Sequence, residues 1–197
     1  MKILICGAGA IGSNLVGVLA PDLKGEHEII VLDKDVVEER NITAGTQLYM
    51  PDQIGIPKVE ALQFNIYKMF QREIEIMQLE VTPKNIIGKL TINDEFPGLL
   101  IDCFDNQEAR ELVKKQYSNK TQILHVGFSK NFTFAIEWEP NYKTPTNIKG
   151  LDICELPGAA AFVKSVASTA ALVAEEYILN HNKIDIVGGK FSYNVIR

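Results

Sequence analysis

The sequence predicts an α/β fold, with a mainly parallel sheet, helices on both of its faces and antiparallel strands at its C-terminal end. Three observations lead to this prediction. Apolar runs of strand length alternate with segments of helical periodicity over residues 2–128. A glycine-rich turn, Gly7–Gly12, joins the first apolar run to the first helical segment. After a long helical segment at 157–180, two further short strands close the chain.

Length and charge narrow the class of protein. With 197 residues, 46% of them apolar and 23% charged, the chain is long enough for one sizeable core and short for two. Residues 1–197 are therefore expected to form a single domain. The net charge of −5 and the absence of a basic run argue against nucleic acid as the main partner.

Cysteine usage and hydropathy predict a reduced, cytoplasmic protein. The three cysteines, Cys6, Cys103 and Cys154, lie far apart and form no CxxC pair, so neither a disulfide framework nor a zinc site is expected. The strand pattern begins at once, so no signal or transit peptide is expected. The most apolar stretch, Gly158–Ala174, is shorter than the ~20 residues of a membrane span, so no membrane partner is expected.

The first forty residues have the layout of a Rossmann-like βαβ nucleotide-binding unit. The strand Lys2–Cys6 runs into Gly7-Ala8-Gly9-Ala10-Ile11-Gly12, a helix opens at Gly12-Ser13-Asn14, and a second strand, Glu28–Leu32, ends at Asp33. The glycines permit a tight turn and close approach of backbone to phosphate, while the helix N-terminus favours anions. Asp33, 21 residues beyond Gly12, is placed to accept hydrogen bonds from ribose hydroxyls. The pattern predicts a nucleotide without specifying which one.

The middle of the chain alternates between irregular, helical and extended patterns. Residues 35–50 form a long connection, interrupted by Gly45. A helix is expected from Lys58 to about Gln71, with an apolar face made by Val59, Leu62, Ile66 and Met69. The alternating pattern of Glu73–Glu80 predicts a strand with one exposed face, and Pro83–Leu90 is a weak helical candidate.

The second half repeats this alternation and then becomes β-rich. Thr133–Trp138 is expected to run antiparallel to its neighbour, and residues 141–150 to form a surface loop. Gly188-Gly189 is the expected turn of a terminal hairpin. The long helix is rich in Ala and Ser, which permits close approach to a sheet or another helix. The other expected elements are strand Leu99–Phe104, helix Gln107–Ser118 with Ala109, Leu112 and Val113 inward, strand Ile123–Phe128, helix Pro157–Asn180, and the hairpin strands Ile184–Val187 and Phe191–Ile196.

Two charged residues stand at element boundaries. Lys58 falls in the first turn of its helix, where a cation opposes the helix dipole, so a bound phosphate explains it better than local stability; the alternative is a solvated surface lysine. Asp105 follows a buried strand at the edge where α/β sheets bind ligands, and there it could hold Mg²⁺ against phosphate oxygens. The run Asp105-Asn106-Gln107-Glu108 also fits an acidic capping box, a role compatible with metal binding.

Four motifs occur in order, and together they resemble the ThiF/MoeB/HesA superfamily, whose eukaryotic members are the ubiquitin-activating E1 enzymes. The similarity covers most of the chain, because Cys154–Leu179 is similar to the family's cysteine followed by a glycine- and alanine-rich helix. The four motifs are Gly7-Ala8-Gly9-Ala10-Ile11-Gly12, Asp33-Lys34-Asp35-Val36-Val37-Glu38-Glu39-Arg40-Asn41, Ile54-Gly55-Ile56-Pro57-Lys58 and Asp105-Asn106-Gln107-Glu108-Ala109-Arg110.

The resemblance implies ATP-dependent adenylation of a carboxylate, usually the C-terminal glycine of a ubiquitin-like or sulfur-carrier protein, by a homodimer. The carboxylate attacks the α-phosphate and pyrophosphate leaves, so the protein's task is positioning and charge neutralisation. The implied catalytic residues are Asp105, Lys58, Arg40 and Cys154. The implied ATP-binding residues are Gly7, Gly9, Ile11 and Gly12 for the phosphates, Asp33 for the ribose, Asp35, and Asn41 and Lys58 for the phosphates, with Asp105 as the Mg²⁺ ligand.

The chain departs from the family pattern in ways that bear on turnover. The arginine that normally follows the asparagine is missing after Asn41, and Arg40 is the candidate substitute. The helix that usually precedes the first strand, with a second arginine, is absent, as are the zinc-binding cysteine pairs. Since trans-acting arginines in phosphoryl transfer are worth ~10³–10⁵ in rate, ATP binding is better supported than efficient adenylation. Cys154 matches a thiol that takes the acyl group in the sulfur-carrier branch; the alternative is a small semi-buried residue before a helix.

Two other functions stay open. An NAD-dependent oxidoreductase would use the glycine loop and Asp33 equally well, but it would leave Lys58 and Asp105 without a task. A non-catalytic, nucleotide- or partner-binding member of the superfamily would explain the missing arginines. The histidines, His125 among them, have no partner at catalytic or metal-ligand spacing and are assigned no role.

Overall fold

Eight strands form one sheet in the computed structural model, across its described residues 1–23, 25–84, 95–129, 131–145 and 156–196. The strands are β1 (Lys2–Cys6), β2 (Glu28–Asp33), β3 (Glu75–Gln78), β4 (Leu99–Asp102), β5 (Gln122–Phe128), β6 (Thr133–Trp138), β7 (Asp185–Gly189) and β8 (Ser192–Ile196). The helices are α1 (Ala10–Asp22), α2 (Glu39–Thr43), α3 (Lys58–Phe70), α5 (Gln107–Tyr117) and α6 (Ala159–Asn180), with a 3₁₀ turn at Pro51–Gln53.

The strand order is β3-β2-β1-β4-β5-β6-β7-β8, parallel from β3 to β5 and antiparallel from there to β8. Central parallel strands are buried on both faces and therefore read as continuous apolar runs. Ile3–Ile5 of β1 and Leu99–Ile101 of β4 are such runs, and all their residues are 0% exposed. The predicted α/β class, with antiparallel strands at the C-terminal end, is confirmed.

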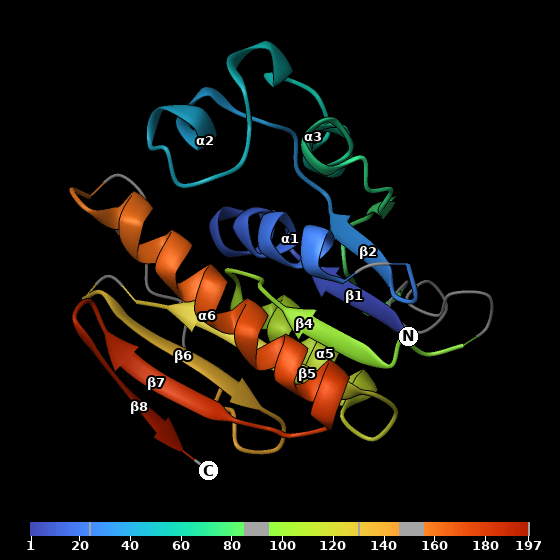
Figure 1. The fold of residues 1–197 in the computed structure, drawn as a ribbon, viewed down its shortest axis with the longest axis vertical. Helices are drawn as coiled ribbons and strands as arrows, with labels where there is room; N and C mark the ends of the chain where they lie inside the picture. The colour runs from blue at the N-terminus through green and yellow to red at the C-terminus, as the bar shows by residue number, and fades with distance from the viewer. Residues whose placement is uncertain (24, 85–94, 130, 146–155, 197) are drawn as a thin grey trace.

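Apolar layers attach helices to both faces of the sheet, as predicted. Figure 1 shows α1 and α6 in front of the sheet and α5 behind β4 and β5. The front layer joins α1, α3 and α6 to the sheet and includes Leu15, Leu62 and Val166. The rear layer includes Val113 and Tyr117 of α5. Leucine 112, predicted to face inward, is only partly buried against the rear layer.

Several element boundaries differ from the predictions. Gly188 and Gly189 belong to β7, and the hairpin turn falls at Lys190-Phe191. Glycine at position 188 allows close strand pairing, because a Cβ there would lie 2.6 Å from the Cβ of Tyr193. The connection 35–50, predicted to be irregular, contains the short helix α2. Only the start of the helical candidate Pro83–Leu90 lies within the described residues, where it is a turn.

Helix α3 buries a polar residue where an apolar one was expected. Met69 is 45% exposed, so its predicted place on the inward face is wrong. Asn65 is buried instead, because its amide bonds to the Leu48 carbonyl at 2.9 Å and to the side chain of Gln53. These bonds fasten α3 to the segment that follows α2.

The long helix α6 packs closely against α1, as its small residues predicted. Four alanines, Ala167, Ala170, Ala171 and Ala174, are fully buried in this layer. Small side chains permit two helix backbones to approach each other closely. Of the helices in the described ranges, none is both long and apolar enough to cross a membrane.

This close contact predicts a size limit at Ala170. Ala170→Leu should lower the free energy of unfolding by about 1–3 kcal/mol, because the added methylene and methyl groups find no free space. Ser168→Leu, on the exposed side of the same helix, should change it by less than about 0.5 kcal/mol. Urea denaturation of the two variants measures the difference, and equal stability would contradict the packing described.

Candidate nucleotide-binding site

The glycine turn after β1 is built against the end of β4. Gly7 has a φ of +98°, which favours glycine, and its N–H donates to the Leu32 carbonyl at 2.7 Å. A Cβ on Gly7 would lie 3.1 Å from the Cys103 carbonyl oxygen, and one on Gly12 only 1.8 Å from the Gly7 oxygen. A Cβ on Gly9 would meet nothing within 4 Å. Gly7 and Gly12 therefore build the turn, whereas Gly9 leaves its outer side open to a ligand.

Among the residues that the structure describes, no side chain caps the N-terminus of α1. The helix begins at Ala10, two residues earlier than predicted, and Gly9 at its N-cap makes no side-chain hydrogen bond. No acidic residue lies in its first turn. The first N–H groups of a helix have no intrahelical partner, and together with the helix dipole they bind anions. This end of α1 can therefore receive a phosphate.

Asp33 braces the glycine turn from β2. Its Oδ2 accepts a hydrogen bond from the Ala8 N–H at 2.6 Å, and its Oδ1 accepts one from the Asp35 N–H at 2.8 Å. Burial raises the pKa of Asp33, although the two amide hydrogen bonds and the charge of Lys58 act against this rise. Each carboxylate oxygen keeps a second lone pair for a ligand hydroxyl. Asp33 therefore stabilises the glycine turn, in addition to the ribose contact predicted for it.

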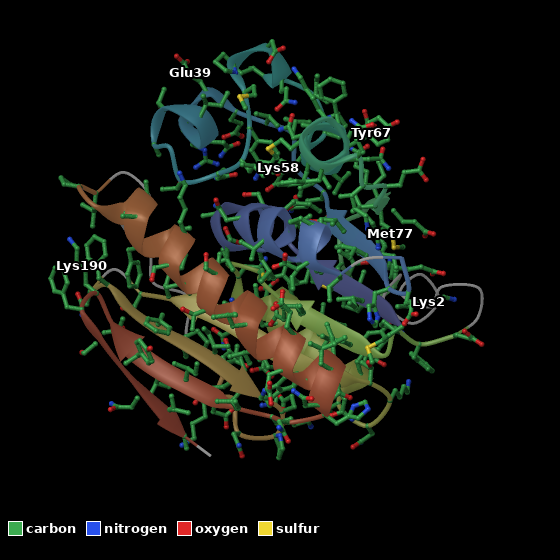
Figure 2. All side chains as sticks on the ribbon, viewed as in Figure 1. Lys2, Glu39, Lys58, Tyr67, Met77 and Lys190 are labelled. Atoms are coloured by element: carbon green, nitrogen blue, oxygen red, sulfur yellow. The ribbon has the colours of Figure 1, made fainter. Side chains whose placement is uncertain are left out.

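Lys58 is a buried cation at the start of α3. It is the first helical residue and only 8% exposed, which does not fit a solvated surface lysine. Its Nζ lies 3.4 Å from Oδ2 of Asp35, and its N–H donates to the Asp35 carbonyl at 2.9 Å. In Figure 2 the Lys58 label lies between α3, α2 and α1. The structure thus brings together two residues that the sequence predicted separately as ATP ligands.

Asn41 and Arg40 lie on α2 in different environments. Asn41 is buried, and its Oδ1 accepts a hydrogen bond from the Glu38 N–H at 2.8 Å, which fixes the start of the helix. Arg40 is exposed and forms an ion pair with the Glu38 side chain. Arg40 is thus held at the exposed side of α2 in this conformation, and would have to leave Glu38 to contact a phosphate.

Asp105 is exposed beyond the end of β4. The predicted capping box is wrong, because Asn106 and not Asp105 is the N-cap of α5, and the Oδ1 of Asn106 accepts the Ala109 N–H at 2.8 Å. Within the described ranges, no hydrogen bond or ion pair engages the Asp105 carboxylate. A free carboxylate oxygen is a suitable ligand for Mg²⁺, which usually takes one or two protein carboxylates together with phosphates. The described residues contain no cluster of three or more metal-ligating side chains.

The strand order brings the predicted residues to one edge of the sheet. β2, β1 and β4 are neighbours and parallel, so Asp33, the glycine turn and Asp105 all follow carboxyl ends of adjacent strands. The Cys103 N–H donates to the Cys6 carbonyl at 2.9 Å, which continues the pairing of β1 and β4 up to the turn. Cys154, the remaining predicted residue, lies outside the described residues.

Two buried polar atoms beside α1 lack partners among the described residues. They are Oγ1 of Thr46 and Oε1 of Gln47. Their segment is attached to α1, because the Asn14 amide donates to the Thr46 carbonyl at 2.8 Å. Buried polar atoms normally have hydrogen-bond partners, so a ligand or water at this edge would satisfy them.

The sequence reasoning missed a charged cluster behind β4 and β5. It centres on Asp102, Arg110 and His125, which contact one another under α5. A charged residue inside the apolar run Leu99–Phe104 was the available signal for Asp102. His125 could not be assigned, because its partners come from two other strands' ends and are distant in sequence.

The α/β fold, together with the residues at the carboxyl ends of β2, β1 and β4, defines a protein of the Rossmann-like nucleotide-binding class. The ThiF family model matches residues 1–197. The chain belongs to the ThiF family.

The curated relatives have different roles. The chain is 26% identical over 214 residues to ubiquitin-like modifier-activating enzyme 5 of Caenorhabditis elegans, covering 98% of this chain and 49% of that protein. It is 27% identical over 124 residues to tRNA threonylcarbamoyladenosine dehydratase 1 of Saccharomyces cerevisiae (strain ATCC 204508 / S288c), covering 62% of this chain and 28% of that protein. The chain therefore spans half or less of the length of these relatives.

Solved structures share the fold. Escherichia coli MccB with MccA-N7isoASN has a TM-score of 0.77 and 18% identity, over 99% of this chain and 63% of that chain. Escherichia coli MccB with ATP has a TM-score of 0.74 and 16% identity, over 100% of this chain and 62% of that chain. Sequences this different retain the same arrangement of strands and helices.

The glycine turn predicts different effects for two similar substitutions. Gly7→Ala should lower the free energy of unfolding by about 1–3 kcal/mol, because it forces a side chain into a positive-φ conformation against Cys103. Gly9→Ala should leave stability unchanged and weaken nucleotide binding, because its Cβ points into open space. Thermal unfolding and calorimetric titration with ATP separate the two effects, and a loss of stability in Gly9→Ala would contradict this division.

The burial of Cys6 and the partial burial of Cys103 predict the pattern of cysteine labelling. Burial, and secondly the charge of Asp102, raises the pKa of both Cys6 and Cys103, so little reactive thiolate forms. Neither should react with iodoacetamide in the folded protein at neutral pH, so any rapid alkylation should map to Cys154. Mass spectrometry of the native and the urea-denatured protein measures this, and native labelling of Cys6 would contradict it.

Proposed function

We propose that this chain binds Mg·ATP at the edge formed by β2, β1 and β4 and adenylates the C-terminal carboxylate of a ubiquitin-like or sulfur-carrier protein or peptide. One observation carries the proposal. The glycine turn is flanked by a buried cation, Lys58, on one side of the edge, and by a carboxylate without a described partner, Asp105, on the other. Bound phosphates would pair with Lys58, and Mg²⁺ would be coordinated by Asp105.

The residues fit this cofactor pair. When bound, Mg·ATP supplies an electrophilic α-phosphorus and a pyrophosphate leaving group. The N–H groups at the start of α1 bind phosphate oxygens, Lys58 neutralises their charge, and Asp105 holds the metal against them. Asp33 and Asp35 bind the nucleoside end next to the glycine turn. The acceptor carboxylate is itself the nucleophile, so adenylation requires no nucleophile from this chain.

The nature of the substrate rests on the relatives and on charge. The worm relative is named for activating a ubiquitin-like modifier, and the similar MccB structures contain the peptide MccA. The yeast relative is named for a tRNA nucleoside, but the net charge of −5 does not favour tRNA here. A protein or peptide C-terminus is therefore the proposed substrate, in the cytoplasm and with the chain as a homodimer.

A nucleotide-binding subunit of low activity is the second candidate. Arg40, the proposed substitute for the family arginine, is paired with Glu38. If Arg40 does not reach the phosphates, Lys58 and the α1 N-terminus carry the charge neutralisation, and pyrophosphate departure slows. A measurement of turnover decides between the two candidates.

ATP–pyrophosphate exchange with candidate carrier proteins, peptides and tRNA tests the proposal. Exchange should depend on a protein or peptide C-terminus, and Lys58→Met and Asp105→Asn should each reduce it by about 10²–10³-fold, because each removes charge stabilisation at the reacting phosphates. The matched controls are Lys68→Met on the same helix and Glu108→Gln beside Asp105, both exposed, and they should exchange at the wild-type rate.

Other outcomes favour other functions. Tight NAD binding with indifference to ATP would overturn the adenylation proposal and favour an oxidoreductase. ATP binding without exchange with any acceptor would favour the subunit of low activity. Exchange that depends on tRNA would replace the polypeptide substrate with a nucleic acid.

A further inference from the structure

A row of acidic and basic side chains lies behind β4 and β5, and three of them, Asp102, Arg110 and His125, are buried. Asp102, the last residue of β4, is 0% exposed. Its Oδ2 lies 3.3 Å from a terminal guanidinium nitrogen of Arg110 and 2.7 Å from Nδ1 of His125. Nε2 of His125 lies 3.0 Å from Oε1 of Glu139, and Nζ of Lys114 lies 3.0 Å from the same oxygen. Acids and bases thus alternate from α5 through the sheet and back to α5.

Tyr142 packs against this row of side chains and bonds to two of them. Its ring stacks on His125, with a centroid distance of 4.0 Å and an interplanar angle of 8°. Its hydroxyl accepts a hydrogen bond from Arg110 at 2.9 Å, and its carbonyl accepts one from Lys114 at 2.8 Å. Arg110 also donates to the Val126 carbonyl of β5 at 2.8 Å. Each acidic or basic side chain in this row therefore has a partner, as buried ionic groups require.

Both backbone segments that flank Asp105 are attached to Asp102. On the N-terminal side, Oδ1 of Asp102 accepts the Phe104 N–H at 3.0 Å and so turns the chain directly before Asp105. On the C-terminal side, α5 starts at Gln107, and Arg110 on its first turn binds Oδ2 of the same carboxylate. Among the described residues, no hydrogen bond or ion pair holds the side chain of Asp105 itself, so its position depends on these two attachments.

Asp102 stays ionised, which lets it hold both the Phe104 N–H and the Arg110 guanidinium. Burial alone would raise the pKa of Asp102, but the charge of Arg110 and the hydrogen bond to His125 outweigh it and keep the pKa below its usual value. An ionised carboxylate accepts hydrogen bonds on both oxygens at once. Replacement by a neutral amide would leave one oxygen for two sets of donors.

We propose that Asp102, held by Arg110 and His125, is a positioning residue that places Asp105 for its contact with Mg²⁺. The inference rests on the proposed function, because it assumes that Asp105 holds the metal of Mg·ATP. Asp102 lies behind the sheet and does not itself touch the nucleotide. Outer residues that orient a metal ligand are typically worth 10- to 100-fold in metal affinity, which sets the expected size of the effect at ~10–100-fold.

Calorimetric titration of ATP in the presence of EDTA and at increasing Mg²⁺ tests the proposal without requiring turnover. Asp102→Asn should weaken the apparent Mg²⁺ affinity by about 10–100-fold and leave metal-free ATP binding unchanged, because the glycine turn and Asp33 are not altered. Arg110→Met should have the same effect. Arg110→Lys should recover part of the loss, because it keeps the charge but lacks the planar fork that reaches Val126 and Tyr142.

Asp185 provides a matched control for lost stability. It is likewise a buried aspartate, and it accepts the Trp138 N–H and the Asn141 amide, each at 2.8 Å. Asp185 begins β7, at the opposite edge of the sheet from Asp105. Asp185→Asn should lower the melting temperature and leave the apparent Mg²⁺ affinity of the ATP complex unchanged.

The outcomes separate this inference from the proposed function. If Asp102→Asn and Arg110→Met melt earlier but keep the wild-type Mg²⁺ affinity, the cluster is purely structural and the inference is overturned. An equal loss of Mg²⁺ affinity in Asp185→Asn would also overturn it, since any loss of stability would then produce the effect. If the wild-type chain binds no ATP in a Mg²⁺-dependent way, the proposed function fails and the inference fails with it. Should Asp102→Asn not fold, the two Arg110 variants decide.

Discussion

The close backbone contact between Gly7 and Cys103 is the constraint on which the candidate site depends. β1 and β4 pair in parallel, and the hydrogen bond from the Cys103 N–H to the Cys6 carbonyl extends the pairing one residue past the end of β4. The glycine turn and the segment leading to Asp105 therefore leave the sheet in contact with each other. Because Gly7 carries no Cβ, the two segments can stay this close. The distance between the glycine turn and the Asp105 carboxylate is thus set by the sheet itself.

Three buried charged residues surround this contact, and each is stabilised differently. Asp33 receives two amide hydrogen bonds and holds the glycine turn. Asp102 belongs to an ionic chain that is fully paired. Among the described residues, the ion-pair partner of Lys58 is Asp35, whose side chain is half exposed. Buried charges need compensation, and within this part of the chain Lys58 is the least compensated of the three.

Membership of the ThiF family establishes the fold of the chain but leaves its substrate open. Relatives that are similar in sequence are named for a ubiquitin-like modifier and for a tRNA nucleoside, and this chain spans half or less of their length. The same fold can carry different functions, so the acceptor is decided by the residues of the site and not by the family.

The sequence by itself determined the α/β class, the glycine turn and the candidate roles of Lys58 and Asp105, because these follow from local patterns: apolar periodicity, positive-φ glycine and charge at an element boundary. It misplaced the α5 cap from Asn106 to Asp105 and gave His125 no role. The cap depends on where the helix starts, and the hydrogen bond from the Ala109 N–H to the Asn106 side chain marks this start. The partners of His125 lie on β4 and beyond β6, and they meet because β4 pairs in parallel and β6 antiparallel with β5. Tertiary structure alone decides such contacts, because strand neighbours are set by packing over the whole sheet.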